Sequence, residues 1–174
     1  MKRAAAQTSP KTALGPGVQF AALPFRRDED LRILLITSRE TGRWVIPKGW
    51  PMKGRKPYAA AAQEALEEAG VEGQVAKQPI GFYRYDKRLP GGGDRRCTVQ
   101  VYPLEVARQR EHWPEQHQRT ARWFTLDEAA EAVLEPELQD LIYVFGLSLG
   151  FTPRSETGLA VAQAFLKGAM LAGE

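Results

Sequence analysis

The chain has 174 residues, 43% hydrophobic and 26% charged, with a formal net charge of +3 and one cysteine, Cys97. This composition is typical of a globular protein with a single core and excludes a disordered or fibrous chain. No apolar run reaches the roughly 20 residues of a membrane span and no signal-peptide core opens the chain, so we expect a cytoplasmic protein without membrane contacts. The mild positive charge suits an anionic small molecule and does not call for nucleic acid.

Small, polar, proline and glycine residues dominate positions 1–17, which predicts a flexible tail. Farther along, β-branched and aromatic runs between turn signals predict strands over 18–25, 31–37, 44–46 and 121–125. A glycine-rich turn predicts a hairpin with arms over 74–89 and 96–106. Helical periodicity predicts helices over 126–134, 137–149 and 155–171, the last with Ser155 as its cap.

A helix is also predicted after residue 56, and it carries an unusual set of charges. Pro57 suits the first helical position and Gly70 suits the left-handed residue that ends a helix. Three carboxylates follow the helical spacing i, i+3, i+4 and therefore share one face: Glu64, Glu67 and Glu68. Like charges at this spacing destabilise a helix by a few tenths of a kcal/mol, and carboxylates near its end oppose the macrodipole. The pattern indicates either a site for divalent cations or an ordinary solvated face.

The loop before this helix is basic. Lys53, Arg55 and Lys56 lie near the positive end of the helix, where they oppose the macrodipole in turn. Anionic phosphate groups bound at this end would account for them.

The stretch 49–71 resembles the signature of Nudix hydrolases, called the Nudix box. The box reads Gly, five residues, Glu, seven residues, Arg-Glu, an apolar residue, any residue, Glu-Glu, any residue, Gly and an apolar residue. Seven positions match it in register: Gly49, Glu64, Ala65, Glu67, Glu68, Gly70 and Val71. Two positions depart, because Arg55 stands where the box has Glu and Gln63 stands where it has Arg. In the family these two side chains brace the loop and orient a glutamate.

The resemblance implies an α/β fold, the Nudix α/β/α sandwich with a mixed sheet, over residues 18–149. Residues 150–174 lie outside the resemblance and are expected to form a helical extension. The resemblance also implies hydrolysis of a diphosphate linkage with Mg²⁺ or Mn²⁺ as cofactor. Glu67 and Glu68 are then the expected metal ligands, and Glu64 is a third ligand or the base that activates water. Backbone carbonyls at Lys48 and Gly49 would add ligands. A later carboxylate, Glu111 or Glu115, completes the site in some family members, and the spacing does not choose between them.

The stretch 37–49 and the run 120–124 are similar to diphosphoinositol-polyphosphate phosphohydrolases. In that branch, arginines before the box bind substrate phosphates, which implies this role for Arg39 and Arg43 with Ser38 nearby. A planar guanidinium binds phosphate through two donors at once. Further cations would extend the same rim: Lys48, Lys53, Arg55 and Lys56.

Two classes of function remain open. The first is a metal-dependent pyrophosphohydrolase acting on a polyphosphorylated small molecule, either a dinucleoside polyphosphate or a diphosphoinositol polyphosphate. The second is a non-catalytic Nudix-fold module that binds an anionic ligand, which the departures at Arg55 and Gln63 permit. ADP-ribose or nucleotide diphosphate hydrolysis and RNA cap removal are weaker enzymatic alternatives. The protein is expected to be a monomer or a homodimer and to bind no nucleic acid.

Overall fold

The structure, a computed structural model, describes residues 17–171. The flexible tail predicted over 1–17 therefore lies almost entirely outside the described residues. The strands are β1 (Gly17–Arg27), β2 (Leu31–Thr37), β3 (Trp44–Val45), β4 (Lys48–Gly49), β5 (Val71–Val75), β6 (Gly81–Arg88), β7 (Asp94–Gln109) and β8 (Ala121–Thr125). The helices are α1 (Pro57–Ala69), α2 (Leu126–Ala132), α3 (Pro136–Ser148) and α4 (Glu156–Leu171).

The eight strands form one mixed sheet with β1 at its centre. β1 runs parallel to β7 from Gly17 opposite Cys97 to Phe25 opposite Glu105, and it pairs antiparallel with β2 and β4. β2 also pairs antiparallel with β3 and β8. The expected mixed sheet is therefore confirmed.

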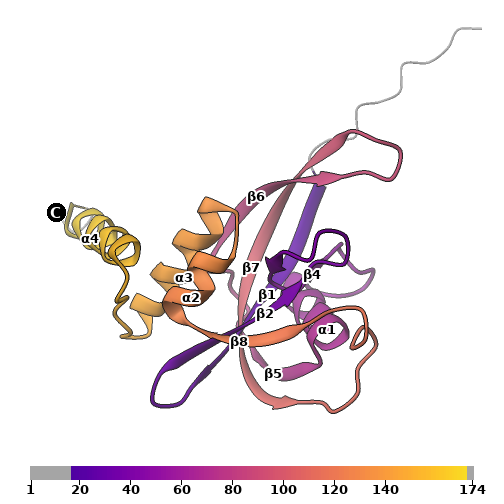
Figure 1. Cartoon of the computed structure of the whole chain (residues 1–174), viewed down its shortest axis with the longest axis horizontal. Helices are drawn as coiled ribbons and strands as arrows, with labels where there is room; N and C mark the ends of the chain where they lie inside the picture. The colour runs from indigo at the N-terminus through magenta and orange to yellow at the C-terminus, as the bar shows by residue number, and fades with distance from the viewer. Residues whose placement is uncertain (1–16, 172–174) are drawn as a thin grey trace, which may run out of the picture.

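The central strands are buried on both faces, so their side chains supply two cores. Leu23, Ile33 and Leu35 pack on one face against α2 and α3. Their neighbours Leu34 and Ile36 point to the other face and pack against α1. Alternation of side chains along a strand places successive residues on opposite faces. The result is the expected three-layer sandwich, with α1 on one face and α2 and α3 on the other (Figure 1).

The helix of the Nudix-like stretch has the predicted ends. α1 begins at Pro57, and Gly70 follows its last residue with φ 68°. Gly70 donates its N–H to the Leu66 carbonyl and packs so closely on Trp113 that a Cβ would clash with the indole ring. A residue with a side chain could satisfy neither requirement without strain. The end of α1 is therefore fixed, and its carboxylates have a fixed direction.

The predicted hairpin differs from the observed one in its first arm. Residues 74–89 were expected to form one strand, but β5 and β6 are separate and take turns along β7. β6 pairs with the first half of β7, and β5 pairs with the second half. Pro79, between the two strands, has no N–H to give to a ladder, which favours the break. The strands predicted over 31–37 and 121–125 match β2 and β8.

The last helix leaves the body of the protein. α4 packs with its first turns on α3, and the remainder projects away from the sandwich (Figure 1). Ser155 caps it as predicted, because its hydroxyl accepts the Gly158 N–H at 3.1 Å. No helix within residues 17–171 is long and apolar enough to cross a membrane.

Candidate active site

An open cleft with a volume of about 600 Å³ crosses the edge of the sheet beside α1. Most of its lining comes from segments far apart in the sequence: the loop between β2 and β3, the strand β4 with the loop that follows it, the helix α1, the strand β6, and the loop between β7 and β8. The lining side chains that carry charge are Arg39, Glu40, Arg43, Lys48, Glu64, Glu67, Glu68, Asp86, Lys87, Arg88, Glu115 and Arg119. Acidic and basic groups therefore meet in one cavity.

All three box carboxylates line this cleft, as the helical spacing predicts. Glu64 is pressed against Gly49, where a Cβ would lie 1.8 Å from a Glu64 carboxylate oxygen. Glycine at position 49 is therefore required for close packing and not for a special backbone angle. Burial, followed by the nearby charges of Glu68, Glu67 and Glu115, raises the pKa of Glu64 to about 7.

Glu67 is held by the residue that departs from the family signature. The Gln63 amide donates a hydrogen bond to the Glu67 carboxylate at 2.7 Å, one helical turn along α1. A neutral amide thus orients this carboxylate where the signature has an arginine. The departure at position 63 preserves a donor and removes a charge.

Arg119 is a central residue that sequence reasoning missed. Its guanidinium lies 2.9 Å from Glu68 and 3.0 Å from Glu115, and it also donates to the Thr37 carbonyl at 3.1 Å. The arginine side chain is only 8% exposed. Glu68 also accepts the Lys48 backbone N–H at 3.2 Å. Burial raises the pKa of Glu68, whereas the charge of Arg119 lowers it.

The structure distinguishes the two later carboxylates that the sequence left open. Glu115 lines the cleft, and its backbone N–H donates to the Glu67 carbonyl at 3.0 Å, which ties its loop to α1. Glu111 is exposed and does not line the cleft. Of these two carboxylates, Glu115 is therefore the one that lies beside the carboxylates of α1.

Of the four carboxylates Glu64, Glu67, Glu68 and Glu115, the last three already have a hydrogen-bond or ion-pair partner. Within residues 17–171, no group of three or more His, Cys, Asp or Glu side chains is placed to hold a metal ion. The donor set nevertheless fits a hard divalent cation, because Mg²⁺ prefers carboxylate oxygens and these four side chains line one cleft. Glu64 is half-buried among like charges, which a cation would neutralise.

The predicted phosphate-binding residues near β3 lie in the same cleft. Ser38 shares a hydrogen bond with the Thr41 hydroxyl at 2.7 Å, which shapes the loop. Arg39 reaches Glu115 at 3.0 Å and is 56% exposed, so it lies at the rim. Arg43 is deeper and forms an ion pair with Glu135, the residue that precedes α3. The second Glu135 carboxylate oxygen is buried without a hydrogen-bond partner among the described residues.

Lys48 lies at the bottom of the cleft. Its ammonium stands 5.1 Å from the centre of the Tyr85 ring, a favourable cation–π distance. The Tyr85 hydroxyl donates to Gln19 at 2.6 Å, which holds the ring in place. Burial lowers the pKa of Lys48 to about 8, although the charges of Glu68 and Glu135 oppose this effect.

Two predicted substrate-binding residues lie apart from the others. Lys53 and Arg55 are exposed on the loop before α1 and are not among the residues that line the cleft. Lys56 is exposed as well. Their proposed contact with phosphate remains a prediction.

The hairpin adds residues that the sequence did not single out. Lys87 and Arg88 of β6 line the cleft together with Trp50 of the loop before α1. The Trp50 ring has the Lys87 ammonium and the Arg95 guanidinium each at 5.1 Å from its centre. The pairing of β6 with β7 positions Lys87 and Arg88 at the cleft, and no local sequence motif predicts this position.

The sequence matches a known family over most of its length. Residues 16–145 match the family model described as the NUDIX domain. The protein named Nudix hydrolase 13, mitochondrial, of Arabidopsis thaliana is 33% identical over 112 residues, which cover 60% of this chain and 54% of that protein. The chain thus spans about half the length of this plant relative. Diphosphoinositol polyphosphate phosphohydrolase 3-beta of Homo sapiens is 29% identical over 143 residues, covering 80% of this chain and 83% of the relative.

Solved structures share the same fold. A binary complex of the C. elegans Ap4A hydrolase superimposes with a TM-score of 0.58 at 19% identity, covering 77% of this chain and 98% of that one. The NUDIX domain of Shewanella oneidensis NrtR, complexed with ADP ribose, gives a TM-score of 0.56 at 15% identity, covering 77% and 90%. At these identities the likeness concerns the fold alone.

Proposed function

The chain belongs to the Nudix hydrolase family, and from this premise we propose that it is a metal-dependent pyrophosphohydrolase. The proposed substrate is a polyphosphorylated small molecule whose diphosphate linkage is cleaved, either a dinucleoside polyphosphate or a diphosphoinositol polyphosphate. One observation carries the proposal: six carboxylates and six cationic side chains line the same cleft, and four of the carboxylates are Glu64, Glu67, Glu68 and Glu115. Such a cleft can hold both a cation and several phosphates.

Each acidic residue has a proposed role. Glu67, Glu68 and Glu115 would hold Mg²⁺ or Mn²⁺, together with backbone carbonyls at Lys48 and Gly49. When bound, the divalent ion neutralises phosphate charge and lowers the pKa of a coordinated water. Glu64 is a further ligand or the general base. Its pKa of about 7 suits a base that works near neutral pH.

The basic residues would select the substrate. Arg39, Arg43 and Lys48 would bind phosphate groups from three depths of the cleft, and Ser38 would orient the loop that carries Arg39. A single diphosphate cannot contact all of these cations together with Lys87 and Arg88. The number of cationic side chains in the cleft favours substrates with many phosphates. The name of the human relative points to the same class of compound.

A panel of substrates tests the proposal. Purified protein is assayed with Mg²⁺ and with Mn²⁺ on ADP-ribose, nucleoside triphosphates, dinucleoside polyphosphates and diphosphoinositol polyphosphates, with products separated by chromatography. We expect activity to rise with the number of phosphates and to disappear when a chelator removes the ion. The Glu67→Gln variant, prepared in parallel, controls for contaminating phosphatases.

Salt dependence adds a second criterion. Exposed charges are screened beyond about 8 Å at physiological ionic strength, so the preference for many phosphates should narrow as salt is added, mainly through KM. If ADP-ribose or a nucleoside triphosphate is the best substrate at every salt concentration, the substrate class is wrong. If the protein binds polyphosphates but hydrolyses none of them with either ion, the non-catalytic binding module is the better description.

A further inference from the structure

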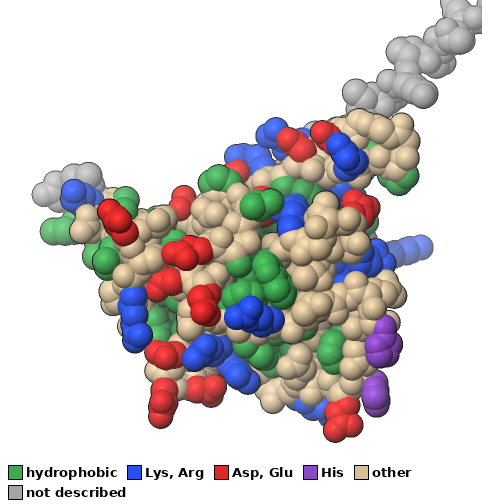
Figure 2. Space-filling view, viewed as in Figure 1, with side chains coloured by type: hydrophobic (Ala, Val, Ile, Leu, Met, Phe, Trp, Pro, Cys, Tyr) green, Lys and Arg blue, Asp and Glu red, His purple; other side chains and the backbone are tan. Residues whose placement is uncertain are grey.

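The helix α4 is apolar on nearly all sides, yet most of it is exposed. Its only charged residues are Glu156 and Lys167. From Gln163 to Met170 every residue is exposed, and the leucine at 166 and the methionine at 170 are 57% and 78% exposed. Hydrophobic side chains are visible on this projecting helix in Figure 2. A helix that is apolar all round is normally buried, so α4 needs a partner surface.

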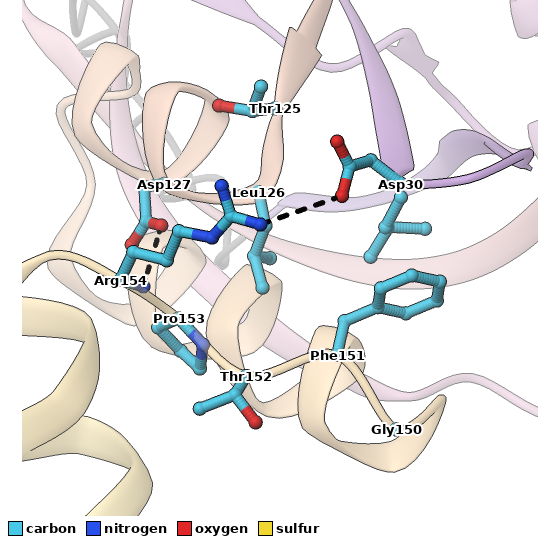
Figure 3. A pocket seen from close by; sticks show the side chains of 10 residues that line it. Asp30, Thr125, Leu126, Asp127, Gly150, Phe151, Thr152, Pro153 and Arg154 are labelled. Carbon is cyan, nitrogen blue, oxygen red and sulfur yellow. Dashed lines mark hydrogen bonds and ion pairs between the residues drawn. The ribbon is translucent and has the colours of Figure 1, made fainter.

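The start of α4 is held firmly to the body of the protein. The Asp127 carboxylate accepts the backbone N–H of Arg154 at 2.8 Å (Figure 3) and that of Ser155 at 3.1 Å. The Ser155 and Tyr143 hydroxyls share a hydrogen bond at 3.0 Å. At Gly158 a Cβ would lie 2.6 Å from the Tyr143 ring, so this glycine lets α4 approach α3 closely. The exposed part of α4 therefore projects in a fixed direction.

Three of the four large exposed apolar residues of α4 form one stripe, and the fourth, Phe165, lies about 120° away around the helix. Leu159, Leu166 and Met170 follow the spacing i, i+7, i+11, and at 3.6 residues per turn they lie within about 40° of one another. All three are exposed. The stripe runs almost the whole length of the helix, which is about 24 Å for 16 residues. It is long enough to pack against another helix.

A polar line follows the stripe along its flank. Glu156, Gln163 and Lys167 repeat the spacing i, i+7, i+11, turned by about 60° from the apolar stripe. The line is negative near the start of α4 and positive near its end. Along the sequence, the point halfway between Glu156 and Lys167 lies within one residue of the point halfway between Leu159 and Leu166. One twofold axis can therefore relate both pairs. An antiparallel copy of the same helix would therefore meet opposite charges and leucines at once.

We propose that a second copy of this chain covers the stripe, with the two α4 helices packed antiparallel about a twofold axis near Ala162. In this homodimer Glu156 of one protomer pairs with Lys167 of its partner, twice by symmetry. Such an interface is self-complementary, as a twofold dimer requires. The same arrangement of charges beside an apolar seam sets partner and orientation in coiled coils. The proposal does not depend on the hydrolytic function.

The oligomeric state of the full chain tests the proposal. Light scattering coupled to size-exclusion chromatography, over a series of protein concentrations, should show a dimer that dissociates on dilution. Leu166→Glu should raise the dimer dissociation constant by about tenfold or more, since it places a charge in the seam. Ala164→Glu is the matched control, because residue 164 is exposed on another side of the same helix and its variant should dimerise normally. A monomer at every concentration, or a dimer unaffected by Leu166→Glu, contradicts the proposal.

A charge exchange tests the orientation. Glu156→Lys and Lys167→Glu should each weaken dimerisation, and the double variant should restore it, because both pairs are re-formed with reversed sign. In the double variant a positive charge lies near the start of α4 and a negative charge near its end, and both are unfavourable for the helix dipole. Recovery of the dimer therefore cannot come from better helix formation. Absence of recovery contradicts antiparallel pairing. Binding of a monomeric wild-type protein to anionic lipid vesicles, lost in Leu166→Glu, would assign the stripe to a membrane surface instead.

Discussion

The Arg119 guanidinium lies 2.9 Å from Glu68 of α1 and 3.0 Å from Glu115, which belongs to the same loop between β7 and β8 as Arg119. Both pairs are largely buried. One arginine therefore neutralises two of the six carboxylates that line the cleft and joins α1 to the loop between β7 and β8. The position is important for stability, because removal of one partner from a buried ion pair leaves an uncompensated charge.

We expect Arg119→Gln to lower the free energy of unfolding by about 3–5 kcal/mol in the absence of divalent ions. Mg²⁺ or Mn²⁺ should recover part of this loss, and should stabilise the variant more than the wild type, because Glu68 and Glu115 are then free to bind the ion. Denaturant unfolding with and without the ion measures both effects. Arg27→Gln is the control, since Arg27 pairs with Glu105 on the exposed surface at 3.2 Å and should cost about 1 kcal/mol or less.

The sequence predicts what local signals determine and misses what pairing of distant strands determines. Pro57 and Gly70 mark both ends of α1, and the spacing of Glu64, Glu67 and Glu68 puts them on one face, so the acidic part of the cleft was predictable. Arg119 lies 51 residues from Glu68 and reaches it because β8 pairs with β2, which no local pattern reveals. The position of Glu115 in the cleft, and of Glu111 outside it, also depends on the pairing of distant strands, so the sequence could not choose between them.

Substitution of the box carboxylates should abolish turnover without unfolding the protein. Glu67→Gln keeps an amide oxygen that can accept from Gln63, so the expected loss is in the rate and not in the melting temperature. Loss of a metal ligand should reduce kcat by about a hundredfold or more, which is several kcal/mol of transition-state stabilisation. Glu68→Gln should have the same effect on kcat.

Steady-state kinetics at saturating Mg²⁺, with circular dichroism on the same samples, checks this prediction. Glu72→Gln is a matched control, because Glu72 pairs with Arg110 at 2.7 Å outside the cleft. Near-wild-type rates in both Glu67→Gln and Glu68→Gln would show that the metal site lies elsewhere.

The raised pKa of Glu64 predicts a dependence of stability on pH. The folded-state pKa, about 7, lies above the ordinary value of 4.5, so the folded protein binds this proton more tightly than the unfolded chain does. The contribution of Glu64 to stability is therefore most favourable below pH 4.5, declines between 4.5 and about 7, and stays unfavourable above that. Glu64→Gln removes the ionised group from the buried site.

In metal-free buffer, Glu64→Gln should accordingly raise the melting temperature above pH 7 and leave it nearly unchanged below pH 4.5, the two limits that the Glu64 pKa shift sets. Addition of Mg²⁺ should reduce the advantage of the variant, because the ion offsets the charge in the wild type. Thermal melts of the wild type and the variant across this pH range, with and without Mg²⁺, test this prediction. An equal gain at every pH would mean that packing, and not ionisation, is responsible.

We expect Arg43 to bind the substrate, and we expect Glu135 to support this binding by orienting Arg43. The two side chains form an ion pair in which both are mostly buried, so Glu135 fixes the direction of the guanidinium. Loss of a hydrogen-bonded charge costs about 1.5–3 kcal/mol, so Arg43→Ala should raise KM for polyphosphorylated substrates by about tenfold to a hundredfold. Glu135→Gln keeps the shape and should raise KM by a smaller factor.

Measurement of kcat and KM for both variants separates binding from chemistry. Glu137→Gln serves as control, since Glu137 pairs with Arg84 on the surface near the start of the same helix. A fall in kcat with unchanged KM in Arg43→Ala would remove Arg43 from the phosphate-binding set.

Arg55 provides a test of the outer rim. The signature has a glutamate at this position, whereas here an exposed arginine lies on the loop before α1 and outside the cleft lining. An exposed cation can attract an anionic substrate over several ångströms but contributes little to folding. Arg55→Ala should therefore raise KM for highly phosphorylated substrates by a few-fold at low salt and leave the melting temperature within experimental error. The effect of Arg55→Ala on KM should vanish as added salt shortens the Debye length from about 30 Å to about 8 Å.

Lys77→Ala is the control. It removes another exposed cation, from the connection between β5 and β6 and away from the cleft lining, and it should change neither KM nor the melting temperature. A large drop in melting temperature with unchanged KM would assign Arg55 to the structure of the loop instead.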